Sequence, residues 1–145
     1  MQIDIRTTPF EPYVELQAYQ DKQCIAGQYG ATAVFIGTMR DFNEGDDVKG
    51  MLLEHYPGMT ENYLQEISRQ AVQNWSLLDS LIIHRVGELK PNEPIVLVAV
   101  WSAHRKEAFE ASRFLMEELK SKAPFWKKEF LEHGHRWVQH NTPGS

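Results

Sequence analysis

Apolar and polar positions along this chain follow periods that predict short strands separated by a few helices. The run over 30–39 is apolar and β-branched, which is typical of a buried strand, and 95–101 is the most apolar run of all. A polar segment over 41–47 lies between two strand patterns, so we expect 30–39 and 49–56 to form a hairpin. The predicted strands cover 2–6, 30–39, 49–56, 81–86 and 95–101, with one or two short strands after Pro124.

Three segments have the spacing of helices. The pattern is weak over 11–22 and clearer over 60–75 and 102–120, where we expect Thr60 and Ser102 to cap the helix starts. The inward-facing positions are Leu64, Ile67, Ala71 and Trp75 in one helix and Ala108, Ala111, Leu115 and Leu119 in the other. Strands outnumber helices and hairpin-type links dominate, which predicts an α+β fold with a mostly antiparallel sheet.

The length and composition indicate one globular domain. The chain has 145 residues, 42% hydrophobic and 24% charged, and we expect a domain over 1–138 and a frayed tail over 139–145. No apolar run approaches the roughly 20 residues that cross a bilayer, and the N-terminus lacks the features of a signal peptide. We therefore expect a cytoplasmic protein without membrane contact. The single cysteine, Cys24, excludes an internal disulfide and is predicted to be a small, at least partly buried apolar residue.

Charge is distributed unevenly, which limits the possible ligands. The formal net charge is -5, and residues 1–62 hold ten acidic and four basic side chains. A nucleic-acid-binding protein is normally basic overall, so nucleic acid is not an expected partner. Any recognition of an anion has to be local. The histidines lack the spacing of metal ligands, so no metal site is expected.

The segment K-S-K-A-P-F-W-K-K over 120–128 is the first candidate site. Pro124 prevents a helix from continuing, so Lys120 is expected near a helix end and Lys127 at the start of the next element. Such a turn can bring two amines over one site, suited to an anion or to chemistry that needs an amine. The alternative is a solvated helix end, which is the better interpretation of Lys120 when it is taken alone. Lys122 is expected to be an ordinary surface lysine.

Two shorter segments are further candidates. The sequence S-A-H-R over 102–105 places His104 and Arg105 at a predicted helix N-terminus, a natural position for binding an anion. A solvated first turn is the alternative, and the residues alone do not decide between them. The sequence G-T-M-R over 37–40 ends a strand with Arg40, which either reaches a ligand or pairs on the surface with Asp41 or Glu44. Taken alone, the residues favour the surface pair.

Several longer motifs together resemble one family. These are L-E-H-Y-P-G-M-T over 53–60, I-H-R-V-G-E-L over 83–89, S-A-H-R with A-F-E-A over 102–111, and L-K-x-x-A-P-F-W-K-K-E over 119–129. In order and spacing they resemble the large, catalytic subunit of molybdopterin synthase, from about Gly30 to Trp137. The resemblance implies an α/β-hammerhead-type α+β domain with a small additional antiparallel subdomain.

The resemblance also implies an activity. Enzymes of this family convert cyclic pyranopterin monophosphate to molybdopterin by inserting two sulfurs, without a cofactor in this subunit. The sulfur arrives as a thiocarboxylate at the C-terminus of a small ubiquitin-like subunit. Two large subunits form a central homodimer, and a small subunit at each end completes a heterotetramer.

The family motifs imply roles for particular positions. Lys120 and Lys127 match the catalytic lysines, which suits the need for proton transfer and anion stabilisation in this chemistry. Residues matching the substrate pocket are Thr38, Met39, Arg40, His104, Arg105, Lys128 and Glu129. The sequence leaves open which lysine acts as the base and whether a covalent adduct forms.

Two other interpretations compete with the enzyme. A module that binds RNA or protein through 120–128 would place aromatic rings beside lysines, but the net charge of -5 argues against it. A degenerate homologue that only docks a partner is disfavoured by the intact set of Lys120, Lys127, Arg40 and His104.

Overall fold

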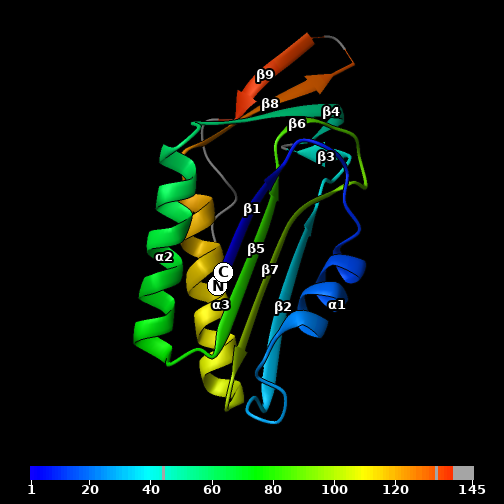
Figure 1. Cartoon of the computed structure of the whole chain (residues 1–145). Coiled ribbons are helices and arrows are strands. Elements are labelled where there is room, and N and C mark those ends of the chain that lie inside the picture. Colours follow the sequence, from blue (N-terminus) through cyan, green and yellow to red (C-terminus); the bar gives the residue numbers. More distant parts are fainter. Residues whose placement is uncertain (44, 133, 139–145) are drawn as a thin grey trace.

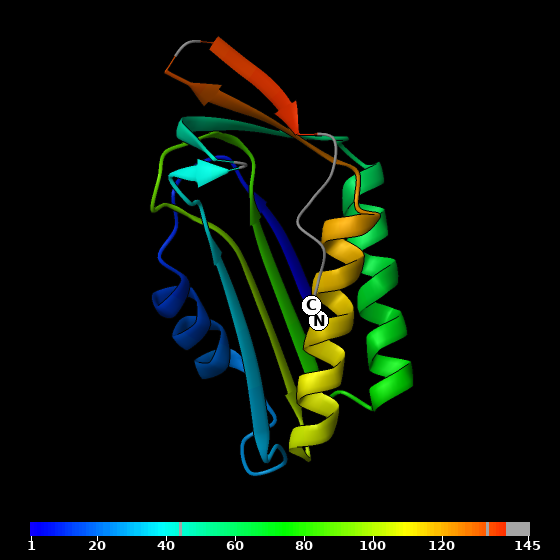
Figure 2. The same cartoon turned by 180° about the vertical axis from the view of Figure 1, so that it is seen from behind.

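Two β-sheets organise the chain, and the second lies across one end of the first (Figures 1 and 2). The computed structural model describes residues 1–43, 45–132 and 134–138, so the expected tail over 139–145 lies outside the described residues. The helices are α1 (Pro12–Lys22), α2 (Met59–Trp75) and α3 (Arg105–Ser121). The strands are β1 (Gln2–Arg6), β2 (Ala31–Thr38), β3 (Phe42–Asn43), β4 (Asp46–His55), β5 (Asp79–Arg85), β6 (Gly87–Leu89), β7 (Pro94–Ser102), β8 (Phe125–Leu131) and β9 (Gly134–Val138).

The first sheet has the order β1-β5-β7-β2. β1 runs parallel to β5, whereas β5 with β7 and β7 with β2 are antiparallel. Helices α2 and α3 cover one face of this sheet and α1 lies on the other (Figures 1 and 2). The sheet therefore has apolar packing on both faces.

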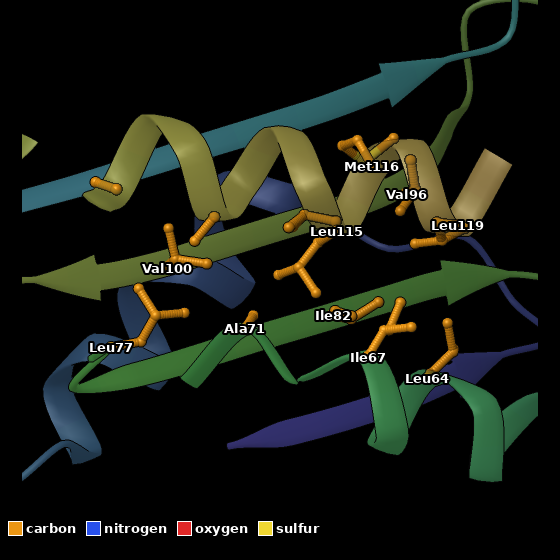
Figure 3. Close-up of a cluster of buried hydrophobic side chains, with 13 residues drawn as sticks. Leu64, Ile67, Ala71, Leu77, Ile82, Val96, Val100, Leu115, Met116 and Leu119 are labelled. Carbon is orange, nitrogen blue, oxygen red and sulfur yellow. The ribbon is translucent and has the colours of Figure 1, made fainter. Parts of the chain in front are cut away.

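The apolar run of β7 explains its central position. Alternate residues of a strand point to opposite faces, so the two sets of side chains enter different clusters. Val96, Val98 and Val100 pack with α2 and α3, and Leu97, Ala99 and Trp101 pack toward α1. Figure 3 shows Val96 and Val100 in this first cluster. A strand apolar on both faces is most stable at the centre of a sheet.

The second sheet forms a smaller antiparallel layer. Its order is β3-β4-β8-β9, and β6 pairs with β4. A separate apolar cluster of Met39, Val48, Met51, Leu53 and Leu89 fills one face. The α+β class, the mostly antiparallel pairing and the additional antiparallel subdomain are confirmed.

The expected hairpin between 30–39 and 49–56 is wrong. β2 pairs with β7 from Ala31 opposite Ser102 to Thr38 opposite Pro94, whereas β4 pairs with β8. The polar segment between them does contain a short turn, because β3 pairs with the start of β4. The chain thus leaves the first sheet after β2 and begins the second.

Both predicted helix caps are wrong. The N-cap of α2 is Gly58, and Thr60 lies in the first turn, where its hydroxyl accepts a hydrogen bond from the Tyr56 amide at 2.9 Å. Ser102 ends β7, and the N-cap position of α3 is His104. The Ser102 hydroxyl donates instead to the His104 carbonyl oxygen at 2.6 Å. Each side chain bonds to the connection before the helix and does not cap it.

Two further expectations can be compared with the structure. Cys24 is exposed, because it lies between α1 and β2 outside the apolar clusters, and the prediction of partial burial is wrong. Among the described residues, no helix combines the length and apolar character needed to cross a membrane.

Candidate active site

The turn between α3 and β8 brings Lys120 and Lys127 to one cavity. Helix α3 ends at Ser121, and the amides of Lys122 and Ala123 both bond to the Glu118 carbonyl oxygen, at 3.0 and 3.1 Å. Pro124 follows and the chain continues as β8. This local geometry was predicted from the sequence, and both lysines line a cavity of about 500 Å³.

The cavity lies where the two sheets meet the end of α3. Its described lining is mainly apolar and aromatic, with a few polar groups, which is typical of small-molecule sites. The lining residues are Gly37, Thr38, Leu53, His84, Ile95, Val96, Met116, Leu119, Lys120, Ser121, Ala123, Phe125, Trp126, Lys127, Trp137 and Val138.

Lys127 has an altered protonation equilibrium. The pKa of Lys127 is lowered to about 8, mainly by burial; the positive charges of Lys120 and Arg40 contribute to the lowering, and Glu129 opposes it. Desolvation disfavours the ammonium form, and nearby like charges add to that effect. A neutral amine is therefore accessible near physiological pH, as a lysine base or nucleophile requires.

Glu129 lies two residues beyond Lys127 on the same face of β8, since strand side chains alternate. Its side chain is buried, and one carboxylate oxygen lies 3.0 Å from Nε of Arg136 in β9. Glu129 thus contributes a paired negative charge beside Lys127. Its predicted place beside the pocket is consistent with this geometry.

Lys128 points to the opposite face of β8. Its Nζ lies 5.3 Å from the centre of the Trp137 ring, within the range of a cation–π contact. Trp137 lines the cavity, whereas the described lining does not include Lys128. Within one chain, Lys128 is therefore a neighbour of the pocket and supports its aromatic wall.

Thr38, Met39 and Arg40 leave β2 at the same cavity. Thr38 lines it, Met39 is buried in the apolar cluster of the second sheet, and the charge of Arg40 acts on Lys127. The Met39 amide donates to the Glu93 carbonyl oxygen at 3.0 Å, and its carbonyl accepts from the Asn92 amide at 2.8 Å. Met39 is thus a core residue whose backbone positions Arg40.

An ion pair between a buried arginine and a partly exposed glutamate supports that backbone connection. Arg85 is 2% exposed, and its Nη1 lies 3.2 Å from a carboxylate oxygen of Glu93, while Nη2 donates to the Glu88 carbonyl oxygen at 2.8 Å. Glu93 also accepts the Lys90 amide at 2.7 Å. The turn before β7 is therefore fixed by a charge that the sequence alone did not identify as structural.

His104 and Arg105 are not brought to the lysines within one chain. They lie at the N-terminal end of α3, and Lys120 lies in its last turn. A helix of 17 residues is about 25 Å long, so the two groups are separated by that order of distance. Gly30 lies beside this loop, and a side chain there would collide with the Ala103 carbonyl oxygen.

His84 is the lining residue that sequence reasoning missed as a candidate. It belongs to the I-H-R-V-G-E-L motif, which was the available signal, but a histidine within a strand pattern gives no sign of facing a cavity. Among the described residues, no group of three or more His, Cys, Asp or Glu side chains could hold a metal ion.

Comparison with known proteins identifies the family. A family model described as MoaE protein matches residues 7–122, most of the chain. The chain belongs to the MoaE family. The MoaE match ends at Lys122, so Lys120 lies inside it and Lys127 beyond it.

Two relatives with the same name are similar to this chain, and the match to the first covers nearly all of it. A protein of Pseudomonas aeruginosa named molybdopterin synthase catalytic subunit is 49% identical over 96% of this chain and 91% of its own length. One of the same name from Ralstonia nicotianae is 60% identical over 77% of this chain, and that match spans 63% of the relative's length.

Solved MoaE structures have the same fold. The MoaE protein of Burkholderia ambifaria has a TM-score of 0.80 at 42% identity, covering 99% of this chain and 92% of that one. A molybdopterin synthase from Staphylococcus aureus has a TM-score of 0.85 at 32% identity, covering 97% and 98%. A two-subunit molybdopterin-converting factor from Helicobacter pylori, at 21% identity, supports the fold alone.

Proposed function

We propose that this chain is the catalytic subunit of a molybdopterin synthase. The observation that carries the proposal is the pair of lysines in one cavity, where the pKa of Lys127 is about 8. The substrate is a cyclic pyranopterin monophosphate, and two sulfurs are transferred to it from the thiocarboxylate of a small partner subunit. Named MoaE relatives support the same activity.

The two lysines have different roles. Lys127 is the residue that exchanges a proton during sulfur transfer, because its neutral form is accessible near pH 8. Lys120 supplies positive charge at the cavity and lowers the pKa of Lys127. Arg40 adds a further positive charge that suits the phosphate of the substrate.

The partner's tail enters at the aromatic rim of the cavity. Trp126 and Trp137 are 44% and 50% exposed while lining it, so apolar surface surrounds a site of positive charge. An extended C-terminal tail that ends in an anionic thiocarboxylate matches both properties. The small-subunit partner proposed from the resemblance therefore has a defined point of contact.

A homodimer supplies His104 and Arg105. β2 is an edge of the first sheet, and Val34 and Phe35 on it are 41% and 38% exposed. A second copy paired antiparallel along β2, with the twofold axis near these residues, places its Ala31 end beside Thr38 of the first. Because Ala31 pairs with Ser102, the second copy's His104 and Arg105 approach the cavity.

The hollow beside β2 agrees with this arrangement. It runs between β2 and α3, includes the exposed ring of Phe109, and shares Lys120 and Met116 with the cavity. The site is thus completed across the dimer. Residues 1–138 form the working domain, and the location proposed for the enzyme is the cytoplasm.

Reconstitution with the thiocarboxylated small subunit and the cyclic phosphate substrate tests the function. We expect dithiolene product from the wild type, and a loss of at least about 100-fold in the rate for Lys120→Ala and Lys127→Ala. Circular dichroism checks that both variants fold. Normal product formation by a folded double variant would contradict the lysine assignment.

Mixing of inactive variants tests the shared site. His104→Ala and Lys127→Ala chains, co-purified as mixed dimers, hold one intact site if each site takes His104 from the other copy. We expect each variant alone to be strongly impaired and the mixed dimers to regain up to half of the wild-type activity per dimer. No recovery in verified mixed dimers would place both residues in the site of one chain.

A further inference from the structure

His84 is a buried histidine on the wall of the proposed active site. It lies in β5, is 5% exposed and lines the same cavity as both lysines. The proposed sulfur transfer assigns it no part. Its contacts identify what it does there.

The backbone fixes the tautomer of its imidazole. Nδ1 lies 2.8 Å from the carbonyl oxygen of Arg85. A carbonyl oxygen can only accept a hydrogen bond, so Nδ1 carries the proton and donates it. In the neutral ring, Nε2 is then the nitrogen with the lone pair, and the ring plane is held at a fixed angle to β5.

The ring face packs on β8. The centroids of the His84 and Phe125 rings are 4.0 Å apart, with 14° between the ring planes. Phe125 and Lys127 are two residues apart in β8, so their side chains leave the strand on the same face. His84 therefore contacts the side chain that stands next to Lys127 in the cavity wall.

Basic groups on three other elements lie near the imidazole. Burial is the largest cause that lowers the pKa of His84, to about 4, and Lys127 on β8, His55 on β4 and Lys120 on α3 also disfavour its protonation. The neighbouring Arg85 guanidinium is bonded to Glu93 and Glu88. The ring is thus uncharged at the pH at which the lysines work.

His84 is a poor proton acceptor for Lys127. Burial lowers the pKa of His84 well below that of Lys127, so the imidazole binds a proton more weakly than the amine does. The contact that its ring makes is the stack on Phe125, which points to a structural role beside Lys127.

We propose that His84 is a positioning residue for Lys127: its uncharged ring, oriented by the Arg85 carbonyl, holds Phe125 against β5 and keeps water from the amine of Lys127. Its importance for catalysis rests on the proposed function, because there Lys127 has to lose its proton readily. A ring at position 84 is required, whereas its nitrogen atoms only orient it.

Two substitutions separate the ring from its nitrogens. His84→Phe keeps an aromatic ring against Phe125 and removes both nitrogens. His84→Asn keeps an N–H donor for the Arg85 carbonyl and removes the ring. Phe125→Leu removes the same stack from the other side and leaves His84 in place, which provides a second test if His84→Asn does not fold.

The readout is the reaction of each lysine with a trace acylating reagent across pH 6–11, followed by peptide mass spectrometry. It reports the protonation of Lys127 without substrate or partner, so it succeeds or fails independently of the proposed function. The exposed Lys122 is the internal reference in every sample.

We expect a labelling midpoint for Lys127 near 8 in the wild type and in His84→Phe. In His84→Asn and in Phe125→Leu, the midpoint should rise by one pH unit or more as water reaches the amine. In the reconstituted enzyme, His84→Asn should lose about tenfold in rate at pH 7.5 and recover at higher pH.

The proposal is overturned if the midpoint stays near its wild-type value in whichever of the two ring-removal variants, His84→Asn and Phe125→Leu, are folded. It is equally overturned if His84→Phe shifts the midpoint as far as His84→Asn, since the nitrogens would then be the essential part.

Discussion

Thr60 and Pro124 are joined by a hydrogen bond between residues 64 positions apart. The Thr60 hydroxyl donates to the Pro124 carbonyl oxygen at 3.0 Å and accepts the Tyr56 amide at 2.9 Å. The start of α2 is thereby fixed to the turn that places Lys120 and Lys127 at one cavity. Thr60 is fully buried, so water cannot replace these two hydrogen bonds.

Removing that hydroxyl should destabilise the protein and disturb the turn. Thr60→Val keeps the shape of the side chain but leaves the Pro124 carbonyl and the Tyr56 amide without this partner. We expect a loss of about 1–3 kcal/mol in the free energy of unfolding, measured by urea denaturation. Thr60→Ser keeps the hydroxyl and should lose clearly less. A Thr60→Val protein that loses no more stability than Thr60→Ser would mean that the two hydrogen bonds of the hydroxyl contribute no more than the methyl group.

Removing the positive charge at position 120 should raise the pKa of Lys127. Lys120→Met removes a positive charge that lowers the pKa of Lys127, so that pKa should rise above about 8. Trace labelling across pH measures the shift directly. Lys122→Met is the matched control, since Lys122 pairs with Glu118 on the surface at 3.3 Å. An unchanged midpoint for Lys127 in Lys120→Met would contradict the coupling between the two amines.

The sequence predicted the local geometry around the lysines because a proline acts locally. Pro124 ends the helix whatever surrounds it, so the placement of Lys120 and Lys127 on successive elements followed from chain chemistry. The helices and most strands were likewise predicted from their periods. The wrong hairpin between 30–39 and 49–56 shows the limit, since the partner of a strand edge is chosen by the whole fold: β2 pairs along β7 and β4 pairs along β8.

Residues that act through tertiary contacts were not found in the same way. His84 and Arg85 look like parts of a strand, and their roles depend on Phe125 and Glu93, which come from other elements. The distance between His104 and Lys120 is set by the length of α3. Sequence reasoning placed them in one site by resemblance, and only a second copy of the chain brings them together in the proposed dimer.

Breaking the ion pair between Arg85 and Glu93 should destabilise the protein. Glu93→Gln leaves the Arg85 guanidinium buried beside an uncharged partner, and we expect a loss of about 2–4 kcal/mol in the free energy of unfolding. The backbone of Met39, bonded to Glu93 and Asn92, should loosen with it and weaken substrate binding through Arg40.

The control for this variant is Glu66→Gln, which disrupts an exposed ion pair with Arg69 and should leave the free energy of unfolding essentially unchanged. A Glu93→Gln protein as stable as this control would show that the pair of Arg85 and Glu93 contributes no more than a surface pair.

The last prediction concerns the stability cost of Lys127. Its pKa is about 8 in the folded protein and near 10.5 when unfolded. Below pH 8 both states are protonated, and the cost of burying the ammonium is fully present. Between pH 8 and 10.5 the unfolded state binds more protons, so the folded state gains stability as pH rises. Lys127→Met lacks this dependence.

We therefore expect the stability advantage of Lys127→Met over the wild type to be largest near pH 7 and to shrink by about 1–3 kcal/mol by pH 10. Urea unfolding of both proteins at several pH values measures the difference in their free energies of unfolding. The titration of all other groups affects both proteins equally and cancels in this difference. Lys122→Met should give a curve parallel to the wild type. If the stabilities of Lys127→Met and the wild type change with pH in parallel, the amine of Lys127 in the wild type has an ordinary pKa. Lys127 could then not exchange a proton near neutral pH as the proposed sulfur transfer requires.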